Sequence, residues 1–93
     1  MSVSPVSTTK LTAAGNIKAS AGELIWLNVA NPTAGGLTAL FHDATSGTSS
    51  EVFQVSVGAT STVFLPFPAG FCFSNGIRCG TLGAGLIVTG GYR

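Results

Sequence analysis

The sequence predicts an all-β fold, namely an antiparallel β-sandwich, jelly-roll-like, of about seven to eight short strands. Three observations predict it. Glycine accounts for 13 of the 93 residues, and β-branched residues are abundant. No window of twelve residues places apolar side chains at the i, i+3, i+4, i+7 spacing of an amphipathic helix. Short runs of alternating apolar and polar residues lie between Gly, Pro, Asn and Ser instead, which is the pattern of strands and turns.

The strands follow one another at a spacing typical of a sandwich or jelly roll. In chain order we expect them near residues 16–20, 23–31, 37–43, 51–57, 61–67, 77–81 and 86–92. In the second of these, alternation directs Ile25, Leu27 and Val29 to one face and Trp26 to the other. Strands that are apolar on one side and more polar on the other suit antiparallel sheets packed around a single core.

The first nine residues differ from the rest of the chain. Residues 1–9 are uncharged, contain Pro5 and lack strong alternation, so we expect an extended N-terminal arm followed by a single domain over residues 10–93. Such an arm lies free or along a neighbouring subunit. Val3, Pro5 and Val6 would then contribute to an interface.

Charge is scarce. Only 8% of residues are charged and the net charge is +1, so the chain has no field with which to hold nucleic acid or an anionic membrane surface. Its longest apolar run, residues 24–27, is far shorter than the ~20 residues of a membrane-spanning helix. The opening MSVSPVSTTK lacks the basic start and apolar core of a signal peptide. We therefore expect a chain that is made and kept in a cytoplasm.

The two cysteines flank an Asn-Gly pair in the stretch FCFSNGIRC. If Asn75-Gly76 forms a two-residue hairpin turn, Cys72 lies opposite Cys79 with about 5.5 Å between the Cα atoms, within reach of a disulfide. A reducing cytoplasm argues against the bond and favours two unbridged, buried thiols. The alternative register makes 71–75 a loop that leads into a strand at Ile77.

Metal and redox chemistry are poorly supported. Two cysteines and one histidine without a nearby carboxylate cannot complete a structural zinc site, and the six-residue gap is not Cys-x-x-Cys spacing. We predict no metal and no cofactor.

No catalytic residue is predicted. His42, the only histidine, precedes Asp43, but neighbouring strand residues point to opposite faces and cannot form a Ser-His-Asp arrangement. We expect His42 to be a hydrogen-bonded or exposed strand residue. The acids Glu23, Asp43 and Glu51 each fall at the edge of a predicted strand, with nothing to bring them together. The sequence therefore predicts a protein that is not an enzyme.

Aromatic residues are more suggestive. Phe64, Phe67, Phe71 and Phe73 fall within ten residues, and alternation cannot bury all four in one thin core. Together with Trp26 they are candidates for a subunit interface, because large aromatics on an outer face tend to mark contact surfaces. The alternative is that they close the open ends of the sandwich.

Three stretches carry a resemblance to a known class of proteins: GNIKASAGELIWLNVANPTAGGLTALFHDATSGT, VSVGATSTVFLPFPAGFCFSNGIRCG and GAGLIVTGGYR. Their order of turns and strands over residues 15–93 resembles small β-rich capsid decoration, or cement, proteins of tailed bacteriophages. The resemblance implies a homotrimeric β-sandwich that binds the major capsid protein on the outer surface of the assembled head and stabilises it. It also implies a place in the virion after synthesis in the host cytoplasm. It assigns no binding residues.

A second class of function is open. A carbohydrate- or receptor-binding β-sandwich module of a phage tail or head fibre would use an exposed aromatic ring as a sugar platform. Trp26 and Tyr92 are the candidates for that role.

Overall fold

The computed structural model describes residues 6–93, which form eight strands joined by turns and loops, with no helix among them. The strands are β1 (Ser7–Leu11), β2 (Gly15–Lys18), β3 (Gly22–Asn31), β4 (Leu37–Asp43), β5 (Glu51–Val57), β6 (Ser61–Phe73), β7 (Ile77–Leu82) and β8 (Ile87–Tyr92). Every pairing between them is antiparallel. The predicted all-β sandwich is confirmed.

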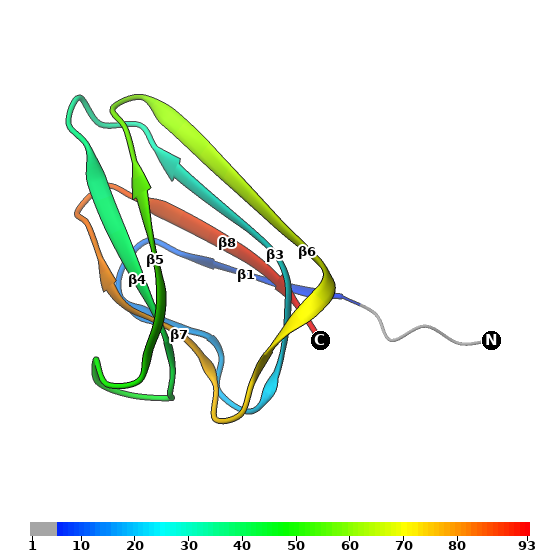
Figure 1. Ribbon diagram of the computed structural model, residues 1–93. Helices are drawn as coiled ribbons and strands as arrows, with labels where there is room; N and C mark the ends of the chain where they lie inside the picture. The colour runs from blue at the N-terminus through cyan, green and yellow to red at the C-terminus, as the bar shows by residue number, and fades with distance from the viewer. Residues whose placement is uncertain (1–5) are drawn as a thin grey trace.

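The strands form two four-stranded sheets, which face one another (Figure 1). One has the order β1-β8-β3-β6 and the other the order β2-β7-β4-β5. The first strand therefore pairs with the last, the second with the seventh, the third with the sixth and the fourth with the fifth. This is the order obtained when one long antiparallel hairpin is rolled up, and it defines a jelly roll.

A single apolar core lies between the sheets. Its residues come from every strand except β1, and each is almost completely shielded from solvent: Ile17, Leu24, Leu27, Val29, Ala39, Phe41, Val55, Val57, Phe73, Ile77, Cys79, Leu86 and Val88. Leu11 of β1 packs against this cluster. Alternating inward side chains of both sheets build such a core.

The N-terminal boundary differs from the expected one. Residues 7–9 of the predicted arm belong to β1, which pairs with β8 along its whole length. The sandwich therefore begins at Ser7 and not at Lys10. Thr8 lies opposite Gly91 in this ladder, so pairing with the C-terminal strand is what orders the segment. The remainder of the predicted arm, apart from Val6, lies outside the described residues.

A β-bulge in β3 changes the predicted faces. The register of β3 shifts between Leu24 and Trp26 against both neighbouring strands. Leu24, Leu27 and Val29 are fully buried, whereas Ile25 is only partly buried. The bulge inserts one extra residue and reverses the alternation at that point. The assignment of Ile25 to the core face was wrong for this reason.

Of the two registers considered for residues 71–77, the hairpin at Asn75-Gly76 does not form, and a strand does begin at Ile77, although β6 extends to Phe73. β6 belongs to one sheet and β7 to the other, so residues 74–76 cross between the sheets. The side chain of Asp43 fixes this crossing, because its carboxylate accepts the backbone N–H groups of Ser74 at 3.0 Å, Asn75 at 2.7 Å and Gly76 at 3.4 Å.

The two long edges of the sandwich differ. β1 and β2 lie close together along one edge. At the other edge β5 and β6 leave the turn at residues 58–60 and diverge, so that the sheets open like a wedge (Figure 1). In residues 6–93 no helix is long and apolar enough to cross a bilayer.

Candidate interaction surface

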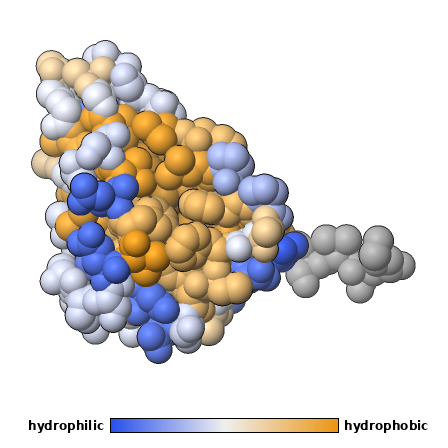
Figure 2. Space-filling model, in the orientation of Figure 1, coloured by the Kyte–Doolittle hydropathy of each residue, from blue (hydrophilic) through white to orange (hydrophobic). Residues whose placement is uncertain are grey.

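Apolar side chains fill the wedge between β5 and β6. Figure 2 shows them gathered in the middle of the face that lies between these two strands. Five partly buried residues that pack against the core form this surface, which we call the β5–β6 seam: Phe53, Val63, Leu65, Phe67 and Phe71. Water therefore reaches the edge of the core at the seam.

Phenylalanine rings connect the two sheets across the seam. Phe53 of β5 lies 6.1 Å from Phe67 and 5.6 Å from Phe71 between ring centroids, and the last two are 5.6 Å apart. Phe53 also stacks on Phe41 at 5.0 Å, and Phe71 meets Phe73 at 5.3 Å. Such separations are favourable for aromatic pairs. The rings form one continuous cluster from the core to solvent.

The strands that border the seam present different edges. β6 carries Pro66 and Pro68, which have no backbone N–H, and its register with β3 breaks between Pro66 and Phe71. β5 contains neither proline nor lysine, and it lies at the end of its sheet with one side unpaired within residues 6–93. Proline, lysine and bends are the usual protection of edge strands against pairing with another chain. β6 has prolines and a bend, whereas the protection of β5 is limited to a bulge at Val52, near its first residue.

A second apolar area lies on the outer face of the sheet formed by β1, β8, β3 and β6. Trp26 and Phe64 contact each other with ring centroids 6.1 Å apart, and Phe64 is 57% exposed. The indole of Trp26 covers Gly91 of β8, where any Cβ atom would collide with the ring. Glycine at position 91 is therefore what allows Trp26 to lie flat against its sheet.

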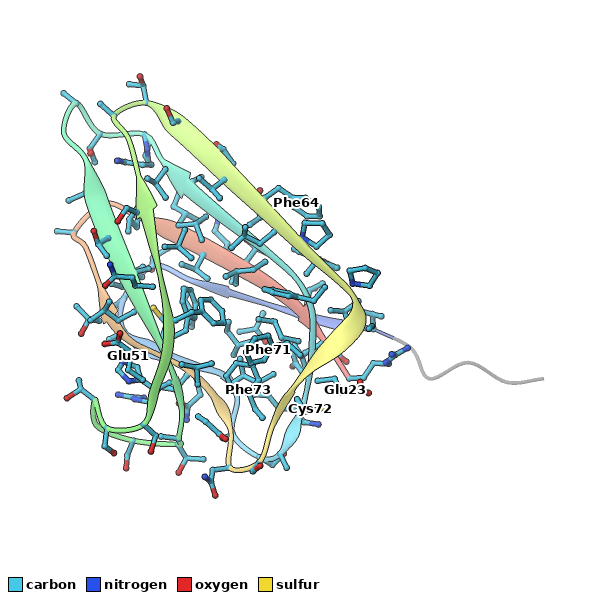
Figure 3. The ribbon with its side chains drawn as sticks, in the orientation of Figure 1. Glu23, Glu51, Phe64, Phe71, Cys72 and Phe73 are labelled. Atoms are coloured by element: carbon cyan, nitrogen blue, oxygen red, sulfur yellow. The ribbon has the colours of Figure 1, made fainter. Side chains whose placement is uncertain are left out.

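The structure separates the predicted interface residues. Figure 3 shows Phe71 and Phe73 directed between the sheets and Phe64 directed away on the other side of β6. Phe73 is 2% exposed and belongs to the core, which leaves it no side-chain surface for a partner. Phe67 and Phe71 are partly exposed in the seam. Val6 is 43% exposed, while Val3 and Pro5 lie outside the described residues.

Sequence reasoning missed three of the five seam residues, Val63, Leu65 and Phe53, and of these Phe53 makes the ring contacts with β6. Its alternation with Gln54 predicts only that it faces the core, and the core-facing side is indeed where it lies. Nothing in the local sequence indicates that β5 is an edge strand or that its neighbour across the sandwich diverges.

Tyr92, the other predicted sugar platform, does not present a free ring. It is partly buried and packs against the core. Its hydroxyl accepts a hydrogen bond from Thr9 Oγ1 at 3.2 Å.

His42 is buried without hydrogen bonds. It is 1% exposed, and neither ring nitrogen has a partner within residues 6–93. The loop over residues 44–50 lies close to it, since a Cβ at Gly80 would fall 2.6 Å from two ring atoms of His42 and 2.9 Å from the Gly47 carbonyl oxygen. Arg78 Nε donates to that same carbonyl at 2.9 Å. The expectation of a hydrogen-bonded or exposed histidine was wrong.

The three acids do not converge. Glu23 and Glu51 lie on opposite sides of the molecule (Figure 3), and Glu23 Oε1 is 3.9 Å from Arg93. The backbone amides that Asp43 accepts, led by those of Asn75 and Ser74, lower the pKa of its carboxyl group. Asp43 thus serves the crossing at residues 74–76 and makes no hydrogen bond to His42.

Both cysteines are free, Cys72 exposed and Cys79 buried. Of the two thiols that were expected to be buried, only that of Cys79 is. Desolvation raises the pKa of the Cys79 thiol to about 11. No group of three or more His, Cys, Asp or Glu residues that could hold a metal, and no pocket, was found in the part of the chain that the structure describes.

Comparison of the chain with models of protein families, with curated proteins and with solved structures gave no match.

Proposed function

We propose that the chain is a structural adhesion protein, specifically a capsid decoration protein of a tailed bacteriophage. It would bind the major capsid protein on the outer surface of the assembled head as a homo-oligomer. The observation that carries the proposal is the β5–β6 seam, where five apolar residues of a weakly charged domain meet solvent. Exposed apolar surface bordered by free strand edges is typical of proteins that work in contact with other proteins.

Two further observations support the proposal. The chain carries only seven charged residues, and its net charge of +1 gives little protection against self-association. Its strand order is that of a jelly roll, an architecture found in viral capsid domains as well as in lectins. The second point is an analogy at the level of fold and not an argument from a site.

Stabilisation of the head follows from mass action. A protein that binds the assembled shell, but not its separated subunits, favours assembly by about 2.7 kcal/mol per site at a free concentration 100 times its dissociation constant. The resemblance described above implies a homotrimer as the unit that binds.

Electron cryomicroscopy of particles from the phage that encodes the chain tests this function. We expect density for the jelly roll at regular positions on the outside of the head. Particles that contain the chain only in the tail, or that lack it, would contradict the proposal.

One observation favours a second candidate, a carbohydrate-binding module of a tail or head fibre. The Trp26–Phe64 pair places a largely exposed ring on the outer face of a sheet, and sugars stack on such rings. Saturable binding on a glycan array that is lost in Trp26→Ala would support this candidate. The absence of binding to any glycan would favour decoration.

A further inference from the structure

We propose that two copies of the chain associate about a two-fold axis, with β5 of one copy pairing antiparallel to β5 of the other. The proposal deepens the adhesion function and rests on it only in that the working unit is an oligomer, and it makes that unit a two-fold pair where the resemblance implies a homotrimer. The partner is a second copy of this chain, and the surface is the free edge of β5 together with the β5–β6 seam.

β5 is the edge that accepts a strand. It offers the backbone groups of a seven-residue strand free of proline, lysine and glycine, whereas β6 is interrupted by Pro66 and Pro68. Short segments of high β-propensity and low charge are the ones that pair with other chains. Pairing through β6 would leave carbonyl oxygens opposite proline nitrogens, so β6 is expected to contribute apolar contacts and not a ladder.

The register follows from the geometry of β5. Residues Phe53–Val57 run in unbroken register with β4, and a bulge at Val52 ends that run. In an antiparallel ladder, hydrogen-bonded and non-hydrogen-bonded pairs alternate, so a two-fold axis must pass through a residue that lies opposite its own copy. Val55 is the centre of the regular run. Phe53 then lies opposite Val57 of the second copy, and Gln54 lies opposite Ser56 of the second copy.

This register matches side chains of the same kind. The inward row of the joined ladder consists of phenylalanine and valine, and the outward row pairs glutamine with serine. The only charged residue of β5, Glu51, lies outside the regular run. The two copies of Glu51 are about 27 Å apart along the strands, from a rise of about 3.4 Å per residue. At this distance their repulsion is screened at physiological salt.

Pairing also covers the seam. It joins two four-stranded sheets into one continuous sheet and brings the two wedges to face one another. Because the strands run antiparallel, the wide end of each wedge, with Phe53 and its ring cluster, then faces the narrow end of the other, at Val57. A contact of this kind uses the same surface on both copies and closes at two subunits.

Disulfide trapping tests the register. In a Cys72→Ser background, the double variant Gln54→Cys/Ser56→Cys places cysteines directly opposite each other on the exposed face, within the Cα separation that a disulfide accepts. We expect a covalent dimer in more than half of the chains under mild oxidation. Each single variant is the control and should form little dimer, because position 54 does not face itself. Equal trapping by the single variants would overturn the register.

Charge at the same edge tests the association itself. Gln54→Lys/Ser56→Lys places like charges opposite each other, and we expect the dimer dissociation constant to rise at least tenfold in analytical ultracentrifugation. The matched control, Thr8→Lys/Thr12→Lys, adds the same charge to exposed positions at the β1 edge and should leave the constant unchanged. Circular dichroism verifies that both variants are folded.

The outcomes separate this proposal from the proposed function. A trimer that decorates heads but is insensitive to charge on β5 overturns the two-fold pairing and leaves the function in place. A dimer that depends on β5 but is absent from virions supports the pairing and overturns the function. A monomer at micromolar concentration overturns the pairing.

Discussion

The two long edges of the sandwich have connections of equal length, but the sheets meet at one edge and stay apart at the other. Three residues link β1 to β2 at one edge, and three residues link β5 to β6 at the other. The first edge is closed by aliphatic side chains, with Ile17 2% exposed and Leu11 packed against the core. The second contains the cluster of stacked phenylalanine rings and remains open to solvent.

The comparison teaches that side-chain volume, and not the length of the connection, sets how far the sheets separate. Aliphatic side chains let the two sheets approach, while five linked rings require centroid separations of 5.0–6.1 Å and occupy the wide part of the wedge. Hydrogen bonds of the Asn31 side chain hold the strands together at the narrow end of this wedge. Those of the Asp43 carboxylate do the same at the wide end.

Truncation of one apolar residue at each edge should give the largest difference in lost stability. We expect Ile17→Ala to lower the free energy of unfolding by about 3 kcal/mol, because it leaves a cavity in the closed edge. Phe67→Ala removes a ring that is partly exposed in the seam, so its cost in the separated subunit should be about 1–2 kcal/mol.

Denaturant unfolding at two protein concentrations measures both effects. The loss in Ile17→Ala should not depend on concentration. The loss in Phe67→Ala should grow with concentration, because the variant also forfeits stabilisation by self-association. Equal, concentration-independent losses would mean that the two edges are equivalent.

Loss of the Asn31 hydrogen bonds at the narrow end should give the next largest decrease in the free energy of unfolding. Asn31 is 1% exposed, and its amide donates to the carbonyl oxygens of Gly35 at 2.8 Å, Val57 at 3.0 Å and Gly58 at 3.1 Å. We expect Asn31→Ala to cost about 2 kcal/mol, since buried carbonyl groups would lose their partner. Thermal unfolding measures the change, and Asn28→Ala on the outer face serves as the control with little effect.

Replacement of the buried histidine should stabilise the protein. His42 occupies the strand next to β5 with no hydrogen-bond partner for its ring within residues 6–93. We expect His42→Leu to raise the free energy of unfolding by about 1 kcal/mol at neutral pH, because it removes an unsatisfied buried polar group. A decrease in stability would indicate that an ordered water or other partner satisfies the ring.

The stabilisation that Asp43 gives the wide end should be present at neutral pH and lost in acid. The folded state lowers the pKa of Asp43 below its ordinary value of 3.8. The contribution of this carboxylate to the free energy of unfolding is therefore complete above pH 3.8 and is lost as the pH falls through the lower pKa of the folded state. We therefore expect the wild type to lose more stability than Asp43→Asn between pH 4 and pH 2. Melting curves across this range compare the two, and parallel declines would contradict the assignment.

Local pattern was sufficient for most strands of the sandwich but not for β1. The segment STTKL alternates too weakly to predict a strand, and it becomes one because the C-terminal strand β8 pairs with it from 83 residues away. The extension of β6 to Phe73 and the burial of His42 have the same origin. Each depends on a neighbour that is distant in the sequence.

The candidate surface was predicted in part. The crowding of phenylalanines in β6 indicated that some of them would meet solvent, and Phe67 and Phe71 do so in the seam. Phe73 is buried because β6 bends between Pro66 and Phe71 and returns its last residues to the core. Phe53 was not expected at a surface, because edge position belongs to the order of strands and not to the strand itself.

The sequence by itself determined that the chain folds as an antiparallel sandwich, because alternation and turn residues act within a few positions of each other. Tertiary structure alone decided which strands end the sheets, where the bulge of β3 reverses its faces and which rings stay in contact with water. These properties arise from contacts between segments far apart in the chain, and local propensity carries no information about such contacts.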